Sequence, residues 1–275
     1  MVNTLSKQRG GTAGNIAYNL ALLKIPVGIV GIAGVDFPEY AKFLQNAGVD
    51  ISKIQAAQNN LTSSAFIMTD KADNQITAFY PGAMEFADKL SLQEITTDLV
   101  VISPNNPQAM VNFSKQCQTL KIPYMLDPGM QLPALSPGDL KEMLNGAEIL
   151  IGNDYEISLL KEKLTLDEEQ ILNQVKILIT TLGEKGSRVQ TKNDNLEIKA
   201  AKPTAVLDPT GAGDAYRAGF LAGYSKNLDL KICAQMGGIA SCYAIEKYGT
   251  SNHTFTVEEF NKRYQENYEE ELKEI

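Results

Sequence analysis

The sequence predicts an α/β fold of three layers, in which helices cover both faces of a mostly parallel sheet. Short apolar runs alternate with amphipathic stretches along most of the chain. Strands that are buried on both faces read as such apolar runs, and their alternation with helices is typical of a parallel sheet. A third observation is a glycine-rich turn, GAGD at 211–214, which separates an extended run from a helical pattern.

Five apolar runs are predicted to form strands of the sheet. They lie at 25–35, 99–103, 122–128, 147–153 and 176–183. Runs of this kind fit strands that helices cover on both faces. A further extended run, KPTAVLD at 202–208, is predicted to lead into the glycine-rich turn as a strand.

Helical patterns separate these runs. Before the first run, Ile16, Leu20 and Leu23 fall on one face of a predicted helix. After the second run, an apolar stripe is formed by Met110, Phe113, Cys117 and Leu120. Ser136 and Pro137 open the helix before the fourth run as an N-cap and a first-turn proline.

Two regions are predicted to be β-hairpins because polar and apolar residues alternate in them. One covers 63–82, and about residues 62–82 are expected to contribute to a small lid. The other turns at Asn193–Asp194. Neither a linker nor an internal repeat divides the sequence, so we expect a single domain over 1–275 with an acidic, solvated helix at its end.

Composition and charge narrow the class of partner. The formal charge is -8 and no basic stripe interrupts it, so neither nucleic acid nor an anionic membrane is an expected partner. No apolar run has the length of about 20 residues that a membrane span needs. The three cysteines, Cys117, Cys233 and Cys242, fall in helical patterns and are interpreted as reduced core residues of a cytoplasmic protein. A small-molecule substrate is therefore the expected partner.

The GAGD turn has the chemistry of a phosphate site. The free N–H groups of residues 211–214 should converge at the start of a helix, where the helix dipole also favours an anion. Asp214 would repel an anion bound there, yet it is well placed to take a proton from an alcohol that attacks phosphorus. The alternative is that Asp214 serves only as a first-turn carboxylate that the dipole favours.

Two other glycine motifs do not fit this turn. A dinucleotide-binding fingerprint would need glycine at position 216, where the chain has Tyr216. A Walker phosphate loop needs a Lys-Ser or Lys-Thr pair after its second glycine, and no stretch of the sequence has one. Phosphate is therefore expected to be held here without a loop lysine.

These residues resemble the ribokinase family, also called the phosphofructokinase B group of carbohydrate and nucleoside kinases. DPTGAGDAYRAGF at 208–220 is similar to the family's C-terminal signature, and RGGTAGNIAYNLALL at 9–23 with VGIVGIAGVD after it is similar to the N-terminal one. NDYE at 153–156 matches the family's Asn-x-x-Glu motif, and TTLGEKG at 180–186 its nucleotide segment. The four motifs stand in the family's order over nearly the whole sequence.

The resemblance implies a role for each matching residue. Asp214 is similar to the catalytic base, and the amides of Gly211, Ala212 and Gly213 to the anion hole. The resemblance places ATP with Asn153, Thr181, Gly183 and Gly186, and the acceptor's hydroxyls with Gly10, Gly11 and Asn15. For metals it implies Mg2+ at Glu156, through water, and in some members a monovalent cation such as K+ at Asp208 and Thr210. Without the resemblance, Glu156 reads as a surface helix carboxylate, and Gly10, Gly11 and Asn15 read as a turn with a helix cap.

The expected activity is transfer of the γ-phosphate of ATP to the 5′-hydroxyl of a nucleoside. The segment DNQITAFYPGAM at 73–84 resembles the lid of the nucleoside and adenosine kinase branch, and Phe79 and Tyr80 could flank a base or simply pack. A sugar kinase, or a nucleoside-binding or nucleotide-binding homologue with weakened catalysis, is the alternative. His253 is interpreted as a surface loop residue. A homodimer is left open.

The sequence departs from the family pattern at its start. Family members begin with a strand that carries an acidic residue, about thirty residues before the Gly-Gly turn, whereas this sequence starts nine residues before Gly10. We therefore expect the first strand of the sheet, and part of the lid, to be missing from this form.

Overall fold

Six strands form the central sheet of the protein. In this computed structural model, residues 5–69 and 75–272 are described. The strand order is β10-β9-β8-β7-β6-β5. The bounds are β5 (Val100–Ile102), β6 (Tyr124–Leu126), β7 (Ile149–Asn153), β8 (Ile177–Thr181), β9 (Ser187–Gln190) and β10 (Asn195–Ile198). Strands β5 to β8 run parallel, whereas β9 and β10 add an antiparallel hairpin at one edge.

Each side of this sheet has a hydrophobic core. Along β7, Ile149 and Ile151 pack into one core while Leu150 packs into the other. All three side chains are fully buried, because successive residues of a strand point to opposite faces. A strand covered on both faces therefore has to be apolar at every position, as the sequence of β7 is.

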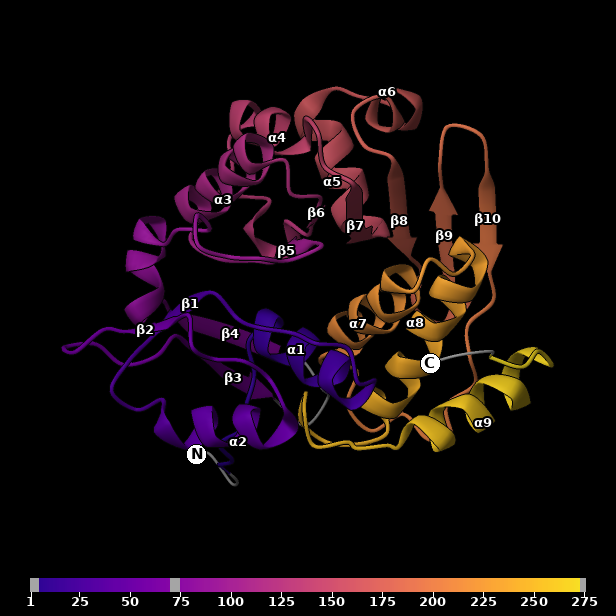
Figure 1. Cartoon of the computed structure of the whole chain (residues 1–275), viewed down its shortest axis with the longest axis horizontal. Helices are drawn as coiled ribbons and strands as arrows, with labels where there is room; N and C mark the ends of the chain where they lie inside the picture. Colours follow the sequence, from indigo (N-terminus) through magenta and orange to yellow (C-terminus); the bar gives the residue numbers. More distant parts are fainter. Residues whose placement is uncertain (1–4, 70–74, 273–275) are drawn as a thin grey trace.

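Helices form the two outer layers (Figure 1). One layer consists of α3 (Pro107–Leu120), α4 (Pro137–Leu144), α5 (Asp154–Leu164) and α6 (Glu168–Leu172). The other consists of α1 (Thr12–Leu22), α7 (Ala212–Ser225), α8 (Leu230–Ile245) and α9 (Val257–Tyr268). The predicted three-layer α/β fold with a mostly parallel sheet is confirmed.

Glycines allow the central pair of helices in the second layer to pack closely. A Cβ atom on Gly219 of α7 would overlap the Met236 carbonyl of α8, and one on Gly237 would lie 2.9 Å from the Tyr216 carbonyl. Each helix is therefore held against the backbone of the other. This packing fixes the position of α7, at whose start Asp214 lies.

Two smaller sheets lie beside the central one. Strands β1 (Gly31–Ala33) and β2 (Ile54–Ala56) pair in parallel, and α2 (Pro38–Ala47) connects them in the sequence. Strands β3 (Ser64–Thr69) and β4 (Gln75–Tyr80) form the predicted hairpin, whose turn at 71–73 lies outside the described residues. The second predicted hairpin, β9 and β10, is also present. The described residues also form the 3₁₀ segments η1 (Gly82–Lys89), η2 (Gly129–Gln131) and η3 (Gly183–Lys185).

Two strand predictions differ from the structure. The run at 25–35 forms only the short β1, with one isolated bridge from Gly28 to Asp50, and β1 pairs with β2 outside the central sheet. The predicted strand at 202–208 is wrong, because the segment is an irregular loop. Its Val206 side chain is 65% exposed, and the Leu207 and Asp208 amides both donate to the Ile245 carbonyl at the end of α8. Extended, apolar residues favour a strand only where a neighbouring strand offers a ladder.

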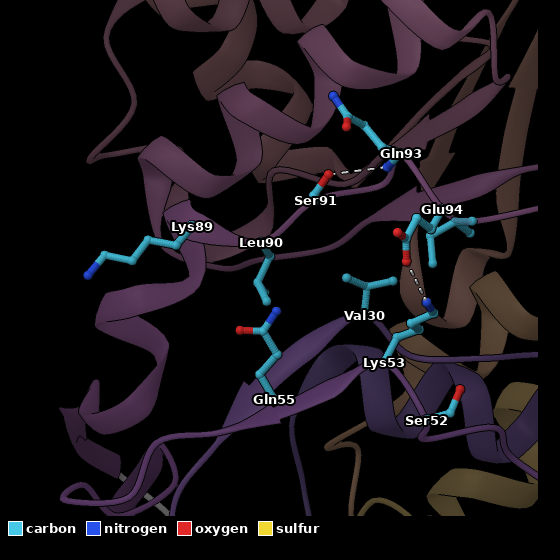
Figure 2. Close-up of a pocket in the computed structure, with 10 residues that line it drawn as sticks. Val30, Ser52, Lys53, Gln55, Lys89, Leu90, Ser91, Gln93 and Glu94 are labelled. Atoms are coloured by element: carbon cyan, nitrogen blue, oxygen red, sulfur yellow. Dashed lines mark hydrogen bonds and ion pairs between the residues drawn. The ribbon is translucent and has the colours of Figure 1, made fainter.

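Strand β1 and strand β5 are both edge strands within the described ranges, since β1 pairs with β2 alone and β5 with β6 alone. Figure 2 shows the groove of about 440 Å³ that lies between β2 and the segment 89–95, which leads toward β5. Lys53 and Glu94 meet across it, with Nζ 3.5 Å from Oε2. None of the predicted site residues lines this groove.

The predicted burial of the three cysteines is confirmed, since Cys117, Cys233 and Cys242 are all buried and free. Burial raises the pKa of the Cys242 thiol to about 11. Within the described ranges, every helix is too short or too polar to cross a membrane.

Candidate active site

The glycine-rich turn opens α7 in a conformation that depends on glycine. Gly211 is the N-cap of the helix and has φ +84°. A Cβ atom there would lie 2.9 Å from Cβ of Thr250, so a side chain would meet both backbone strain and a close neighbour. The Ala212 amide donates to the Pro209 carbonyl at 3.2 Å. The amides of Gly211, Gly213 and Asp214 have no such acceptor within the described residues and remain free for an anion.

Asp214 lies in the first turn of α7, half-buried, and is held by Asn15. The Asn15 amide Nδ2 donates to Oδ2 of Asp214 at 2.7 Å. Burial raises the pKa of Asp214 to about 6, although the hydrogen bond from Asn15 and the positive charge of Arg217 act in the opposite direction. A carboxyl with a pKa just below neutrality is matched to the work of a general base at neutral pH.

Thr250 orients the Asn15 amide, a link that the sequence did not indicate. Thr250 Oγ1 lies 2.8 Å from Asn15 Oδ1 and 3.0 Å from the Arg9 carbonyl, and its single proton can be donated to either oxygen. Because Oδ1 of Asn15 faces this hydroxyl, its Nδ2 is directed at Asp214. The same threonine touches Gly211. Thr250 therefore joins the Gly-Gly turn, Asn15 and the GAGD turn.

Gly10 and Gly11 precede α1 on the same side of the molecule. Gly11 is the N-cap of α1 with φ +93°. The Tyr40 hydroxyl donates to the Gly10 carbonyl at 3.0 Å and occupies the space that a Cβ on Gly14 would need. Burial raises the pKa of Tyr40 to about 12, so this phenol remains a donor. The structure thus brings the residues predicted to bind the acceptor to the predicted base.

The NDYE segment forms a capping box at the start of α5. Asn153 Oδ1 accepts from the Glu156 amide at 2.8 Å, and Glu156 Oε2 accepts from the Asn153 amide at the same distance. Read without the family resemblance, Glu156 was interpreted as a surface helix carboxylate, and this interpretation describes its local structure correctly. No group of three His, Cys, Asp or Glu side chains is placed to hold a metal in the chain as described. Glu156 uses only its Oε2 in the capping box, and among the described residues no such group includes it. A single carboxylate of this kind fits Mg2+ that is held mainly by water and phosphate, and does not fit a cage of protein ligands.

The predicted nucleotide segment forms the turn from β8 to β9. Thr181 ends β8, and Gly183 and Gly186 bound the turn η3 with φ of +60° and +96°. A Cβ on Gly186 would overlap the Ile198 carbonyl oxygen of β10, whereas one on Gly183 would meet nothing within 4 Å. The Tyr216 hydroxyl of α7 donates to Ser187 Oγ at 2.7 Å and so connects the helix that carries Asp214 to this turn.

The loop before α7 is closed by Asp208. Its Oδ1 accepts from the Thr210 amide and its Oδ2 from the Gly249 amide, both at 2.9 Å. Burial opposes ionisation here, but these hydrogen bonds more than offset it and lower the pKa of Asp208. Asp208 is thus an anion that holds the loop next to Thr250.

A buried ion pair below the GAGD turn was not predicted. Arg217 of α7 and Asp127, which follows β6, are 7% and 1% exposed. Asp127 directly follows a buried strand, and Arg217 interrupts an apolar helix, so both could have been noticed as charges at core positions.

The interpretation of His253 as a surface residue is wrong. The side chain is 2% exposed, and its Nε2 lies 2.8 Å from Asn19 Oδ1 inside the protein. Burial lowers the pKa of His253 to about 4, so the ring is neutral at ordinary pH. The sequence suggested a loop, but this loop packs against α1, where the Tyr18 hydroxyl donates to the His253 carbonyl.

The segment that leads into the β3–β4 hairpin is tied to the loop after β1 by Asp36. Its Oδ1 accepts from the amide and the hydroxyl of Thr62, both at 2.7 Å, and these bonds contribute to lowering the pKa of Asp36 against the effect of burial. Phe79 and Tyr80, which were predicted to flank a base or to pack, are 50% and 40% exposed.

Residues 1–256 match the pfkB family carbohydrate kinase profile. The chain is 33% identical to a nucleoside kinase of Methanocaldococcus jannaschii over 259 residues, which cover 94% of this chain and 85% of that protein.

Solved structures agree. The nucleoside kinase of Burkholderia thailandensis in complex with inosine has a TM-score of 0.96 at 30% identity, over 99% of this chain and 92% of that one. The same kinase was also solved with ADP-inosine. Arabidopsis thaliana ribokinase, solved with ribose and ATP, matches with a TM-score of 0.78 over 96% of this chain and 90% of that one, and at 20% identity shows the fold alone.

Proposed function

Because this chain belongs to the pfkB family of carbohydrate kinases, we propose that it transfers the γ-phosphate of ATP to the 5′-hydroxyl of a nucleoside. A kinase that acts on a hydroxyl group is what the family establishes, and the donor, the acceptor and the residue roles are the proposal. The observation that carries it is the half-buried Asp214, which lies beside the free amides of Gly211 and Gly213 and is fixed by Asn15.

In this proposal Asp214 accepts the proton of the attacking hydroxyl as the bond between that oxygen and the γ-phosphorus forms. The bond from the γ-phosphorus to the β,γ-bridging oxygen of ATP breaks in the same transfer, and ADP leaves with that electron pair. Its Oδ2 is already held by Asn15, which leaves Oδ1 to take the proton of the acceptor's hydroxyl. The amides of Gly211, Gly213 and Asp214 stabilise the charge that develops on the transferred phosphoryl group, assisted by the dipole of α7. The Asn153, Thr181, Gly183 and Gly186 positions hold the nucleotide from the ends of β7 and β8.

Two metal ions belong to the proposal. Glu156 would hold Mg2+ through water, and the ion supplies charge neutralisation on the β- and γ-phosphates when it is bound. Asp208 and Thr210 would hold a monovalent cation such as K+ beside the GAGD turn. The partly exposed charge of Asp208, which its hydrogen bonds keep ionised, supports a cation there.

A nucleoside is favoured over a free sugar by the relatives and by the hairpin. The two most similar solved or curated proteins given above are both named nucleoside kinases, and one was solved with inosine. A base adds apolar contact area that a free sugar lacks. The exposed Phe79 of β4 could supply a surface for it, on the hairpin face opposite to Tyr80, Phe66 and Met68. The sugar kinase, and a binding homologue with weakened catalysis, remain the alternatives.

A coupled assay of ADP production over a panel of acceptors tests this function. Inosine, adenosine and cytidine should give higher kcat/KM values than ribose or fructose 6-phosphate, because specificity follows differential binding of the transition state. A preference for a free sugar would assign the chain to the ribokinase type. Nucleoside binding by calorimetry without ADP production would favour the binding homologue.

The remaining features of the proposal concern the whole protein. We propose a single domain over 1–275, with residues 62–82 as its lid, and a cytoplasmic location because three free buried cysteines suit a reducing compartment. We also propose a homodimer formed through the β3–β4 hairpin, which exposes large apolar side chains on both faces.

A further inference from the structure

A bidentate ion pair lies directly beneath the GAGD turn. The Arg217 Nη2 atom donates to Asp127 Oδ1 at 2.7 Å, and its Nε lies 2.6 Å from Oδ2, close enough for an ion pair. The third nitrogen, Nη1, donates to the Gly213 carbonyl at 2.9 Å. One guanidinium therefore connects the carboxyl end of β6 to the peptide that joins Gly213 to Asp214.

The position of this pair is costly for folding. Both side chains are less than 10% exposed, and removing two charges from water costs several kcal/mol per ion before their attraction is counted. Apolar residues of similar volume are often as stabilising or more so at such sites. Stability alone therefore gives little reason for the pair to occur at this buried position.

The pair lies where the catalytic turn needs support. The peptide that accepts from Arg217 is the one whose N–H, on Asp214, belongs to the proposed anion hole. Gly213 also approaches the guanidinium closely, since a Cβ on it would lie 2.9 Å from Nη1. The planar guanidinium, bonded to Asp127 on one side and to the Gly213 carbonyl on the other, can fix this peptide. A flexible side chain would allow the peptide to tilt.

We propose that Arg217 and Asp127 are positioning residues of the phosphoryl transfer, which hold the Gly213–Asp214 peptide in the orientation that the transition state needs. The inference rests on the proposed role of Asp214 and extends it to two buried residues that act through the backbone of the turn. Misplacement by about 1 Å can cost a factor of about 100 in rate, so a support of this kind is worth its cost in stability.

The charges of the pair also reach Asp214 itself. Arg217 lowers the pKa of Asp214 and Asp127 raises it, next to the larger effect of burial. The ionisable and polar groups that face Asp214 are Asn15 from α1, Tyr40 from α2, Arg217 from α7 and Asp127 after β6. Asp127→Asn keeps an acceptor for Arg217 but removes a negative charge, so the acid limb of the kcat/KM profile should move to lower pH. A purely structural pair would leave that limb in place.

The deciding experiment replaces both members with apolar residues of similar size. The double variant Arg217→Met/Asp127→Leu should have a thermal midpoint at or above that of the parent, because no charge is left buried alone. Its kcat, on the best acceptor, should fall by about 10-fold or more while KM for ATP changes little. As a matched control, Arg263→Met/Glu246→Leu removes a different ion pair, which is largely buried but makes no hydrogen bond to the GAGD turn within the described residues. This variant should keep the kcat of the parent.

Arg217→Lys provides a second variant if the double variant does not fold. Lysine keeps the charge but not the fork, so kcat should fall while the acid limb stays near that of the parent. Turnover like the parent's in either variant overturns the inference. Asp214→Asn is measured in parallel. If that variant is inactive while the double variant is fully active, the positioning role alone fails, and if Asp214→Asn is active, the proposed base fails with it.

Discussion

At the scale of the single residue, the carboxyl group of Asp214 is subject to two opposing effects: burial favours its neutral form, whereas the proposed catalysis needs its ionised form. As the proposed base, Asp214 has to be ionised for turnover, so kcat/KM should fall as the pH drops through about 6. Asp214→Asn should lower kcat by about 100-fold or more and remove that acid limb, while nucleotide binding stays close to that of the parent. Steady-state kinetics at about unit pH intervals between roughly pH 5 and 8 measure the acid limb. Calorimetric titrations with ADP measure nucleotide binding.

The same variant should be more stable than the parent above pH 6. A carboxyl whose folded pKa is raised stabilises the protein at low pH, and this contribution is lost as the pH rises through the folded value. Asparagine removes the ionised form, and a gain of about 1 kcal/mol corresponds to roughly 2–4 °C in the midpoint. A variant with near-normal turnover, or one with a lower midpoint at pH 8, would contradict the assignment.

At the scale of the element, the turn between β8 and β9 contains two glycines with different requirements. Gly186→Ala should destabilise the protein strongly, because its Cβ would overlap the Ile198 carbonyl at φ +96°. Gly183→Ala should cost only about 1–2 kcal/mol, the ordinary penalty of a left-handed backbone, since its Cβ meets open space. Thermal midpoints of the two variants measure the difference.

Gly183→Ala serves as the matched control in this comparison, since both glycines belong to the same predicted nucleotide segment. Equal midpoints would mean that the β8–β10 packing can relax around a methyl group. A rise in KM for ATP in the stable Gly183→Ala variant would support its proposed place in the nucleotide groove.

At the scale of the whole molecule, the β3–β4 hairpin exposes apolar side chains that a monomer would leave in water. Phe66, Met68 and Ile76 share one face, since Phe66 pairs with Ala78 and Met68 with Ile76, and they are 61%, 58% and 69% exposed. We expect the parent to sediment as a dimer and Phe66→Ser/Ile76→Ser to sediment as a monomer, because such patches mark association surfaces.

The control for this test removes exposed apolar residues elsewhere. Met130 and Leu120 are 75% and 39% exposed but do not lie on the hairpin, so Leu120→Ser/Met130→Ser should keep the sedimentation of the parent. A parent that stays monomeric over the whole concentration range would exclude the proposed dimer.

Much of the architecture was readable from local pattern. The runs at 147–153 and 176–183 became β7 and β8, and the GAGD and NDYE motifs each lie at the start of a helix, as predicted. These features depend on neighbours in sequence: apolar runs, caps and glycine conformations. The shortened β1 and the loop at 202–208 show the limit, because an extended run becomes a strand only if a partner edge is near.

The contacts that complete the site lie between residues far apart in the chain. Asn15 and Asp214 are separated by 199 positions, Thr250 and Asn15 by 235, and Arg217 and Asp127 by 90. No periodicity or spacing encodes such pairs, because they arise only when α1, α7 and the ends of the strands are packed together.

By itself, therefore, the sequence determined the fold class, the family and the chemistry of the individual motifs, since each of these is written in residues that are close along the chain. The tertiary structure alone decided that Thr250 orients Asn15, that His253 is buried and that an arginine bonds to the backbone of the GAGD turn. The physical reason is that burial and hydrogen-bond direction depend on the surrounding side chains, and packing supplies those from distant segments.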